Sequence, residues 1–129
     1  MIIGATSFFT HYYAIKDKSF LFALRIVKLY QYLCESKREF VLSKQILRSG
    51  TSIGANVRES EQAQSKADFI HKLSISLKEA NETDYWLDLL FPSGYINEKI
   101  YTSLKYDCEE IIKILVAIIK TSKNNMDNE

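Results

Sequence analysis

Apolar residues recur every three or four positions along most of this 129-residue chain, which is the spacing of one face of an α-helix. The pattern predicts four helices, over about residues 19–35, 40–64, 65–91 and 97–123. Their connections are short, and no alternating pattern typical of a β-strand competes with them. We therefore predict an all-α fold, an antiparallel up-and-down four-helix bundle.

Short sequences typical of helix ends mark the predicted connections. Residues 36–39 (SKRE) and 65–68 (SKAD) have the form of a capping box, in which a Ser and an acidic side chain bond to free backbone N–H groups. Pro92 and Gly94 predict the end of the third helix, and Asn97 predicts the start of the fourth. These signals agree with the boundaries that the apolar pattern gives.

The second predicted helix carries two glycines on its buried face. This stripe of small and apolar residues includes Ser49, Gly50, Ile53, Gly54 and Val57. Glycine inside a helix costs about 1 kcal/mol relative to alanine, so its presence requires a compensating contact. Because small residues on neighbouring turns let a second helix approach closely, we predict a continuous, closely packed helix here rather than a phosphate-binding loop.

The length and composition are those of one soluble globular domain, with 47% hydrophobic and 26% charged residues. We expect the bundle over residues 19–123, an extension outside the bundle over residues 1–18, and a fraying polar tail over residues 124–129. The first residues lack the basic start of a signal peptide, and this run is too short and too interrupted by polar groups to span a membrane. Cys34 and Cys108 fall within apolar helical patterns, so we expect reduced thiols and a cytoplasmic protein.

A net charge of +1 means that only a local patch of basic residues would attract nucleic acid. Lys44, Arg48 and Arg58 recur along one face of the second helix, and Lys37 and Arg38 lie in the turn before it. These five residues are the candidate nucleic-acid site. The alternative is a solvated face, or pairing with acidic residues of the third helix. A symmetric oligomer would repeat the patch and so strengthen its attraction for phosphates.

Candidate catalytic groups are scarce. His11 and His71 occur in no metal-binding motif, so we expect neither a metal nor a cofactor. Four polar residues fall on the second and third helices, namely Asn56, Glu59, Glu79 and Glu82. Paired carboxylates can act in acid–base catalysis, but no nucleophile or metal accompanies them. We therefore interpret the four as inter-helix or inter-subunit hydrogen-bonding groups and expect no enzymatic activity.

Two helices have more apolar surface than a single bundle needs. The apolar arc of the first covers about half of its circumference, where roughly 100° is usual. The third has a second apolar set, consisting of Ile75, Tyr85, Trp86, Leu89 and Leu90. Because soluble monomers rarely expose so large a patch, both features predict a homo-oligomer.

Three segments resemble a known bacterial family. They are residues 44–59 (KQILRSGTSIGANVRE), 65–69 (SKADF) and 76–87 (SLKEANETDYWL). The sequence is similar, over about residues 19–123, to the four-helix-bundle proteins named after intervening sequences in large-subunit ribosomal RNA genes. The resemblance implies a left-handed bundle, often assembled as a homopentameric ring, with no known catalytic activity. It also implies a more distant relationship to the accessory proteins of diversity-generating retroelements, pentamers that bind nucleic acid and a reverse transcriptase.

The sequence thus leads to a functional hypothesis with two alternatives. The hypothesis is a non-enzymatic homo-oligomer, with five subunits implied by the resemblance. This oligomer serves as a scaffold for RNA, DNA or a ribonucleoprotein, or for another nucleic-acid-processing protein, and it has no membrane partner. The first alternative is a protein-binding adaptor that does not contact nucleic acid. The second is a catalyst that uses Glu59, Glu79 and Glu82.

Overall fold

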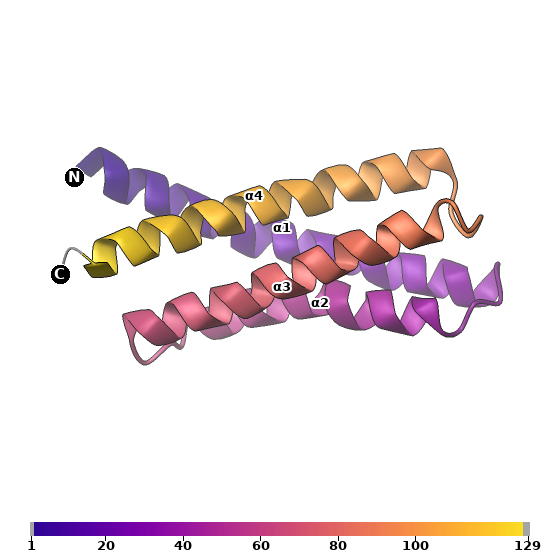
Figure 1. The fold of residues 1–129 in the computed structure, drawn as a ribbon, viewed down its shortest axis with the longest axis horizontal. Helices are drawn as coiled ribbons and strands as arrows, with labels where there is room; N and C mark the ends of the chain where they lie inside the picture. Colours follow the sequence, from indigo (N-terminus) through magenta and orange to yellow (C-terminus); the bar gives the residue numbers. More distant parts are fainter. Residues whose placement is uncertain (1, 128–129) are drawn as a thin grey trace.

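The computed structural model describes residues 2–127, with side chains from residue 8 onward, and this part of the chain forms four helices. They are α1 (Ile2–Glu35), α2 (Leu42–Ser60), α3 (Lys66–Leu90) and α4 (Glu98–Asp127). Successive helices run in opposite directions along the long axis (Figure 1). Each helix packs against the next, and α1 also packs against α4. The predicted all-α up-and-down bundle is confirmed, while its left-handed sense stays a prediction.

The core is a single cluster of mainly aliphatic side chains, to which all four helices contribute. Cys108 lies fully within it and donates to the backbone oxygen of Ala80 at 3.3 Å. Burial raises the pKa of the Cys108 thiol to about 12, so this sulfur stays protonated and unreactive at neutral pH. Cys34 is half-buried, and both cysteines are free.

The N-terminal residues are part of the bundle, so the predicted boundary at residues 18 and 19 is wrong for the described residues. α1 begins at Ile2, Ile15 is fully buried, and the Tyr12 hydroxyl is hydrogen-bonded to Ser60 at 2.9 Å. Phe8, Tyr12 and Ile15 continue the spacing of the buried stripe toward the N-terminus. At the other end α4 continues to Asp127, so residues 124–127 are helical rather than frayed.

Two of the three predicted helix starts are confirmed by their hydrogen bonds. Ser65 Oγ accepts from the Asp68 backbone N–H at 3.0 Å, and Asn97 Oδ1 accepts from that of Ile100 at 2.8 Å. The capping box predicted at residues 36–39 does not form, because α2 begins only at Leu42 and its first turn is capped differently. The described α2 is therefore shorter at both ends than the predicted segment 40–64.

The helix continues through both glycines, as predicted, because α1 crosses α2 there at close range. A Cβ atom added to Gly50 would lie 2.8 Å from both Cγ atoms of Ile26, which is closer than real contacts allow. At Gly54 the added atom would lie 3.3 Å from the backbone oxygen of Ser19. The two glycines thus set the distance between α1 and α2.

The remaining residues of the small-residue stripe face α3 or the core. The hydroxyls of Ser49 and Thr83 are hydrogen-bonded at 2.9 Å. Ile53 and Val57 are buried, and Ser76 of α3 donates to the Ile53 backbone oxygen at 2.8 Å. α2 is consequently packed closely on two sides.

Candidate functional site

Arg48, the central residue of the predicted basic stripe, forms ion pairs within the bundle. Its guanidinium donates to Glu79 Oε2 at 3.0 Å and to Glu82 Oε2. The indole N–H of Trp86 donates to the same Glu82 oxygen at 3.0 Å. Of the two interpretations of this residue, pairing with the third helix is the one the structure shows, and Arg48 joins α2 to α3.

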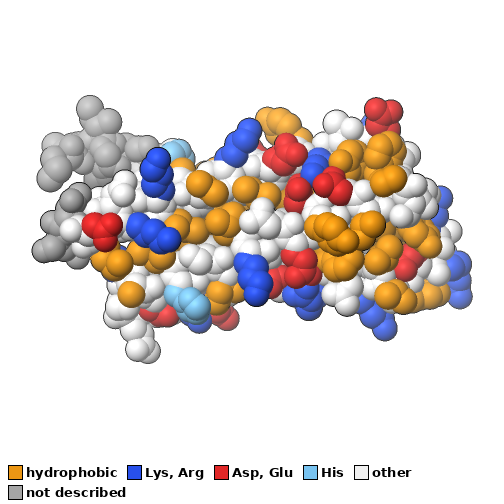
Figure 2. Space-filling view, in the orientation of Figure 1, with side chains coloured by type: hydrophobic (Ala, Val, Ile, Leu, Met, Phe, Trp, Pro, Cys, Tyr) orange, Lys and Arg blue, Asp and Glu red, His pale blue; other side chains and the backbone are white. Residues whose placement is uncertain are grey.

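The face that α3 and α4 present carries no continuous basic surface. Figure 2 shows basic and acidic side chains intermixed across it. Lys105 illustrates the pattern, since its ammonium group lies 2.7 Å from Asp84 and 2.9 Å from Asp88. This face is therefore a poor candidate for binding phosphates.

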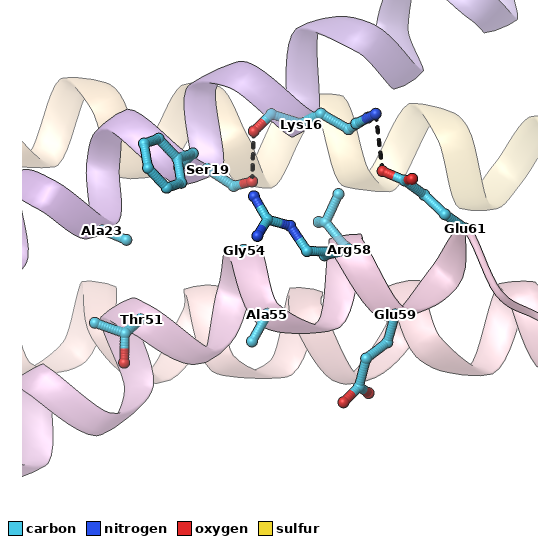
Figure 3. A pocket seen from close by; sticks show the side chains of 11 residues that line it. Lys16, Ser19, Ala23, Thr51, Gly54, Ala55, Arg58, Glu59 and Glu61 are labelled. Carbon is cyan, nitrogen blue, oxygen red and sulfur yellow. Dashed lines mark hydrogen bonds and ion pairs between the residues drawn. The ribbon is translucent and has the colours of Figure 1, made fainter.

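Arg58 lies in a furrow between α1 and α2 (Figure 3). The furrow has a volume of about 400 Å³, and its walls include Ser19, Phe20, Ala23, Thr51, Gly54 and Ala55. The Arg58 guanidinium lies 5.9 Å from the centre of the Phe20 ring and makes no ion pair with a described side chain. A salt bridge of 2.8 Å between Lys16 and Glu61 borders the furrow. Arg58 thus lies beside Lys16 and Glu61, apart from the four other residues of the predicted basic site.

The other three predicted basic residues lie in the α1–α2 turn or in the first turn of the helix that follows it. Lys37 and Arg38 are in the turn, Lys44 is in the first turn of α2, and all three are exposed. None forms an ion pair with the side chains from residue 8 to 127. The Arg38 guanidinium lies 5.1 Å from the centre of the Phe40 ring. Together with Phe40 and Val41, we call these residues the α1–α2 tip.

Glu39 determines the shape of the α1–α2 tip. Its carboxylate accepts from the backbone N–H groups of Val41, Leu42 and Ser43 at 3.0, 3.1 and 2.8 Å. The Ser43 hydroxyl donates to the Glu39 backbone oxygen at 2.8 Å. Arg38 adopts φ = +54°, a left-handed conformation that is uncommon outside glycine. These bonds hold the turn in one conformation despite that strain.

Burial would raise the pKa of the Glu39 carboxyl, but its bonds to the N–H groups of Ser43, Leu42 and Val41 together lower it below 4.5. We expect Glu39→Gln to reduce the free energy of unfolding by about 1 kcal/mol at neutral pH, because the acceptor loses its charge. A lowered pKa stabilises the fold above pH 4.5, and this contribution disappears as the pH falls through the pKa of the folded state. Urea unfolding of both proteins should therefore show a difference that shrinks on acidification. An equal difference at every pH would contradict this role of the carboxylate.

The predicted polar residues do not meet at one place. Glu59 forms an ion pair with Lys72 of α3 at 3.6 Å, whereas Glu79 and Glu82 bind Arg48. The three carboxylates therefore make inter-helix contacts between α2 and α3, Glu59 through Lys72 and the other two through a single cation, Arg48. Asn56 instead donates to the Ser52 backbone oxygen at 2.8 Å, within α2.

Two further features bear on chemistry and location. In the part of the chain that the structure describes, no three His, Cys, Asp or Glu side chains are grouped to hold a metal ion. None of the helices over residues 2–127 is both long and apolar enough to cross a lipid bilayer.

The outward face of α1 is apolar over most of its length. The exposed fractions of Phe9, Tyr13, Phe20, Leu24 and Val27 are 55%, 61%, 51%, 47% and 37%. From Tyr13 onward these residues follow the spacing of seven, four and three that is typical of a helix–helix seam. We call these five residues the outer α1 stripe. It lies opposite the buried face of the same helix, so the bundle leaves it uncovered.

The second apolar set predicted on α3 makes no comparable patch. Leu90 is fully buried, and Ile75, Trp86 and Leu89 are half-buried. Tyr85 is the exposed member, at 57%. The prediction of an α3 patch is therefore wrong, because α3 packs against both α2 and α4 and covers these residues.

Comparison with known proteins identifies relatives along most of the chain. The family described as 23S rRNA-intervening sequence protein matches residues 12–117. A crystal structure of a protein of unknown function, from the S23 ribosomal protein family of Bacteroides thetaiotaomicron VPI-5482, is 61% identical. The two superpose with a TM-score of 0.84, over 85% of this chain and 98% of that one. No curated protein matches the sequence. The chain belongs to the 23S rRNA-intervening sequence protein family.

Proposed function

We propose that the protein is a non-enzymatic homo-oligomeric scaffold that binds RNA through its α1–α2 tip. The observation that carries the proposal is the uncovered outer α1 stripe, which supports self-association. The name of the family associates it with ribosomal RNA genes, which favours RNA as the nucleic acid. The proposed homopentamer comes from the family resemblance.

Self-association would remove an unfavourable exposure of apolar side chains. The chain exposes 7820 Å², about a tenth more than the roughly 7,000 Å² typical of a compact monomer of 15.0 kDa. Much of the outer α1 stripe is aromatic or branched aliphatic, and burying such side chains drives most protein association. A helix of a second copy that packs along the stripe would form the kind of seam that its spacing favours.

Assembly would also give a nearly neutral chain a useful affinity for RNA. Lys37, Arg38 and Lys44 have no carboxylate partner among the described side chains, so they are available to phosphates. The α1–α2 turn, from which the tip is built, lies at one end of an elongated bundle (Figure 1). Ring symmetry would place equivalent tips at one rim, where one RNA backbone contacts several of them.

The test is filter binding of labelled ribosomal RNA fragments, between about 50 and about 200 mM salt. We expect weaker binding at the higher salt, because phosphate contacts release counterions. The triple variant Lys37→Gln, Arg38→Gln, Lys44→Gln should lose most of the binding. A matched triple variant on α4, Lys113→Gln, Lys120→Gln, Lys123→Gln, should retain it. Equal losses in both variants, or binding without salt dependence, would contradict the proposed site.

Changing Arg48 would be a less informative test of the same idea. Arg48→Glu would place three carboxylates together, with Glu79 and Glu82 left without their cation. Any loss of binding would then include a loss of helix packing. The tip variants avoid this complication because their side chains make no ion pair in the described chain.

The second candidate function is a protein-binding adaptor that does not contact nucleic acid. The outer α1 stripe favours it, since an apolar seam also fits a helix of a different protein. Light scattering separates the two, because an adaptor of this kind is a monomer until its partner binds. RNA binding by the purified protein would exclude the adaptor.

A further inference from the structure

We infer that the α1–α2 tip binds unpaired nucleotides, with the ring of Phe40 as a stacking platform, and that duplex RNA lacks this contact. The inference rests on the proposed function and specifies the form of RNA that the tip accepts. It follows from the geometry of a single turn. The relevant features are an exposed aromatic ring, three cations without carboxylate partners, and a rigid backbone.

The apolar residues of the tip face solvent, although residues next to them in the sequence are buried. Phe40 is 45% exposed and Val41 is 70% exposed, between the buried residues Glu39 and Ser43. The ring of Phe40 is covered in part by the Arg38 guanidinium, 5.1 Å from its centre. Because bases stack both on aromatic rings and on guanidinium planes, the pair forms one platform.

The charges of the tip distinguish it from Tyr13 and Phe20, two other exposed aromatic residues that lie beside a cation. Beside Tyr13, the cation Lys16 is neutralised by Glu61. Arg58, beside Phe20, lies in a furrow whose lining also includes the carboxylates of Glu59 and Glu61. At the tip, Lys37, Arg38 and Lys44 are exposed without such neutralisation, and the carboxylate of Glu39 is turned inward to the backbone. Aromatic rings combined with free cations are typical of sites that bind single-stranded nucleic acid.

The backbone of the tip is fixed before any ligand binds. Three N–H groups bound to Glu39 and the bond from the Glu39 N–H to the Leu33 oxygen, at 2.9 Å, define the turn. A preorganised turn loses little conformational freedom on binding. The bases of a duplex are stacked on one another and offer their faces only at its ends, so Phe40 would gain contact only with unpaired nucleotides.

The experiment compares two fluorescein-labelled probes by anisotropy, a single-stranded oligo(U) and a blunt-ended RNA duplex of equal length. The wild-type protein should bind the single strand more tightly. Phe40→Ala should weaken binding to oligo(U) by about fivefold to a hundredfold, the loss typical of one base–aromatic stack. Binding to the duplex should stay within about twofold. Phe40→Tyr should restore single-strand binding because it keeps the ring.

Tyr106→Ala is the matched control, because Tyr106 is an exposed aromatic residue of α4 outside the tip, at 69%. It should leave both affinities unchanged. Circular dichroism of each variant checks that the fold is intact, as expected for changes at exposed side chains.

The following outcomes would overturn the inference. The wild-type protein could bind the two probes with equal affinity, or Phe40→Ala could lose the same affinity for both. Either result would contradict the stacking platform but not the proposed RNA binding. Salt-independent binding, or none to either probe, would instead remove the proposed function itself. Binding to vesicles of phosphatidylserine and phosphatidylcholine, with no binding to RNA, would assign the basic and apolar tip to membrane surfaces.

Discussion

Replacing Gly50 by leucine is expected to reduce the free energy of unfolding by about 1–3 kcal/mol, and the loss should lie near the upper end of this range. An added Cβ alone would lie 2.8 Å from both Cγ atoms of Ile26. Ile26 is fully buried and β-branched, so its side chain has little freedom to move away. Either α1 and α2 separate or the core distorts. Urea unfolding followed by circular dichroism measures the loss.

Smaller substitutions provide the controls for this prediction. Gly50→Ala gains about 1 kcal/mol of helix propensity. It should still be destabilising, because the alanine Cβ atom alone would clash with Ile26. Gly54→Ala should cost less, since its nearest contact is 3.3 Å. Combining Gly50→Ala with Ile26→Ala should cost less than the sum of the single changes, because Ile26→Ala removes both Cγ atoms. A stabilising Gly50→Ala together with a neutral Gly50→Leu would contradict the close approach of the helices.

A glutamate at Leu24 is expected to convert the proposed oligomer to a folded monomer. Leu24 is in the middle of the outer α1 stripe and is 47% exposed in the single chain. A charge at the centre of an apolar interface loses its hydration without gaining a partner, which costs several kcal/mol per interface. The fold itself should persist because the side chain points away from the core. Size-exclusion chromatography with light scattering gives the mass, and circular dichroism gives the helicity.

Val116→Glu is the matched control for Leu24→Glu. Val116 lies on α4 and has the same exposed fraction, 47%, but no apolar stripe accompanies it. This variant should keep the mass of the wild-type oligomer. Dissociation of both variants to the same extent would indicate that α1 has no special role in assembly.

The fold and the helix contact at Gly50 could be predicted from the sequence because both depend on local spacing. The predicted boundary at residue 18 failed for a physical reason. Residues 1–15 contain no Lys, Arg, Asp or Glu, so the contrast between polar and apolar faces that marks an amphipathic helix is weak there. Phe8, Tyr12 and Ile15 nevertheless continue the buried spacing.

The candidate site could be predicted only in part because ion pairs depend on which helices become neighbours. Lys44, Arg48 and Arg58 share a face of one helix, yet the structure gives each a different environment. Arg48 reaches two carboxylates of α3, and Arg58 reaches a ring of α1. The inward turn of the Glu39 carboxylate was also missed, because the capping-box pattern assigned Ser36 rather than Glu39 as the residue that caps α2.

The most direct test of the central claim is the mass of the wild-type protein in solution. We expect light scattering at micromolar concentration to report a homo-oligomer, with a homopentamer giving about five times the chain mass of 15.0 kDa. Its formation would bury the outer α1 stripe, so hydrogen exchange of α1 should slow on assembly. A mass of one chain, unchanged over the concentration range, would contradict the account.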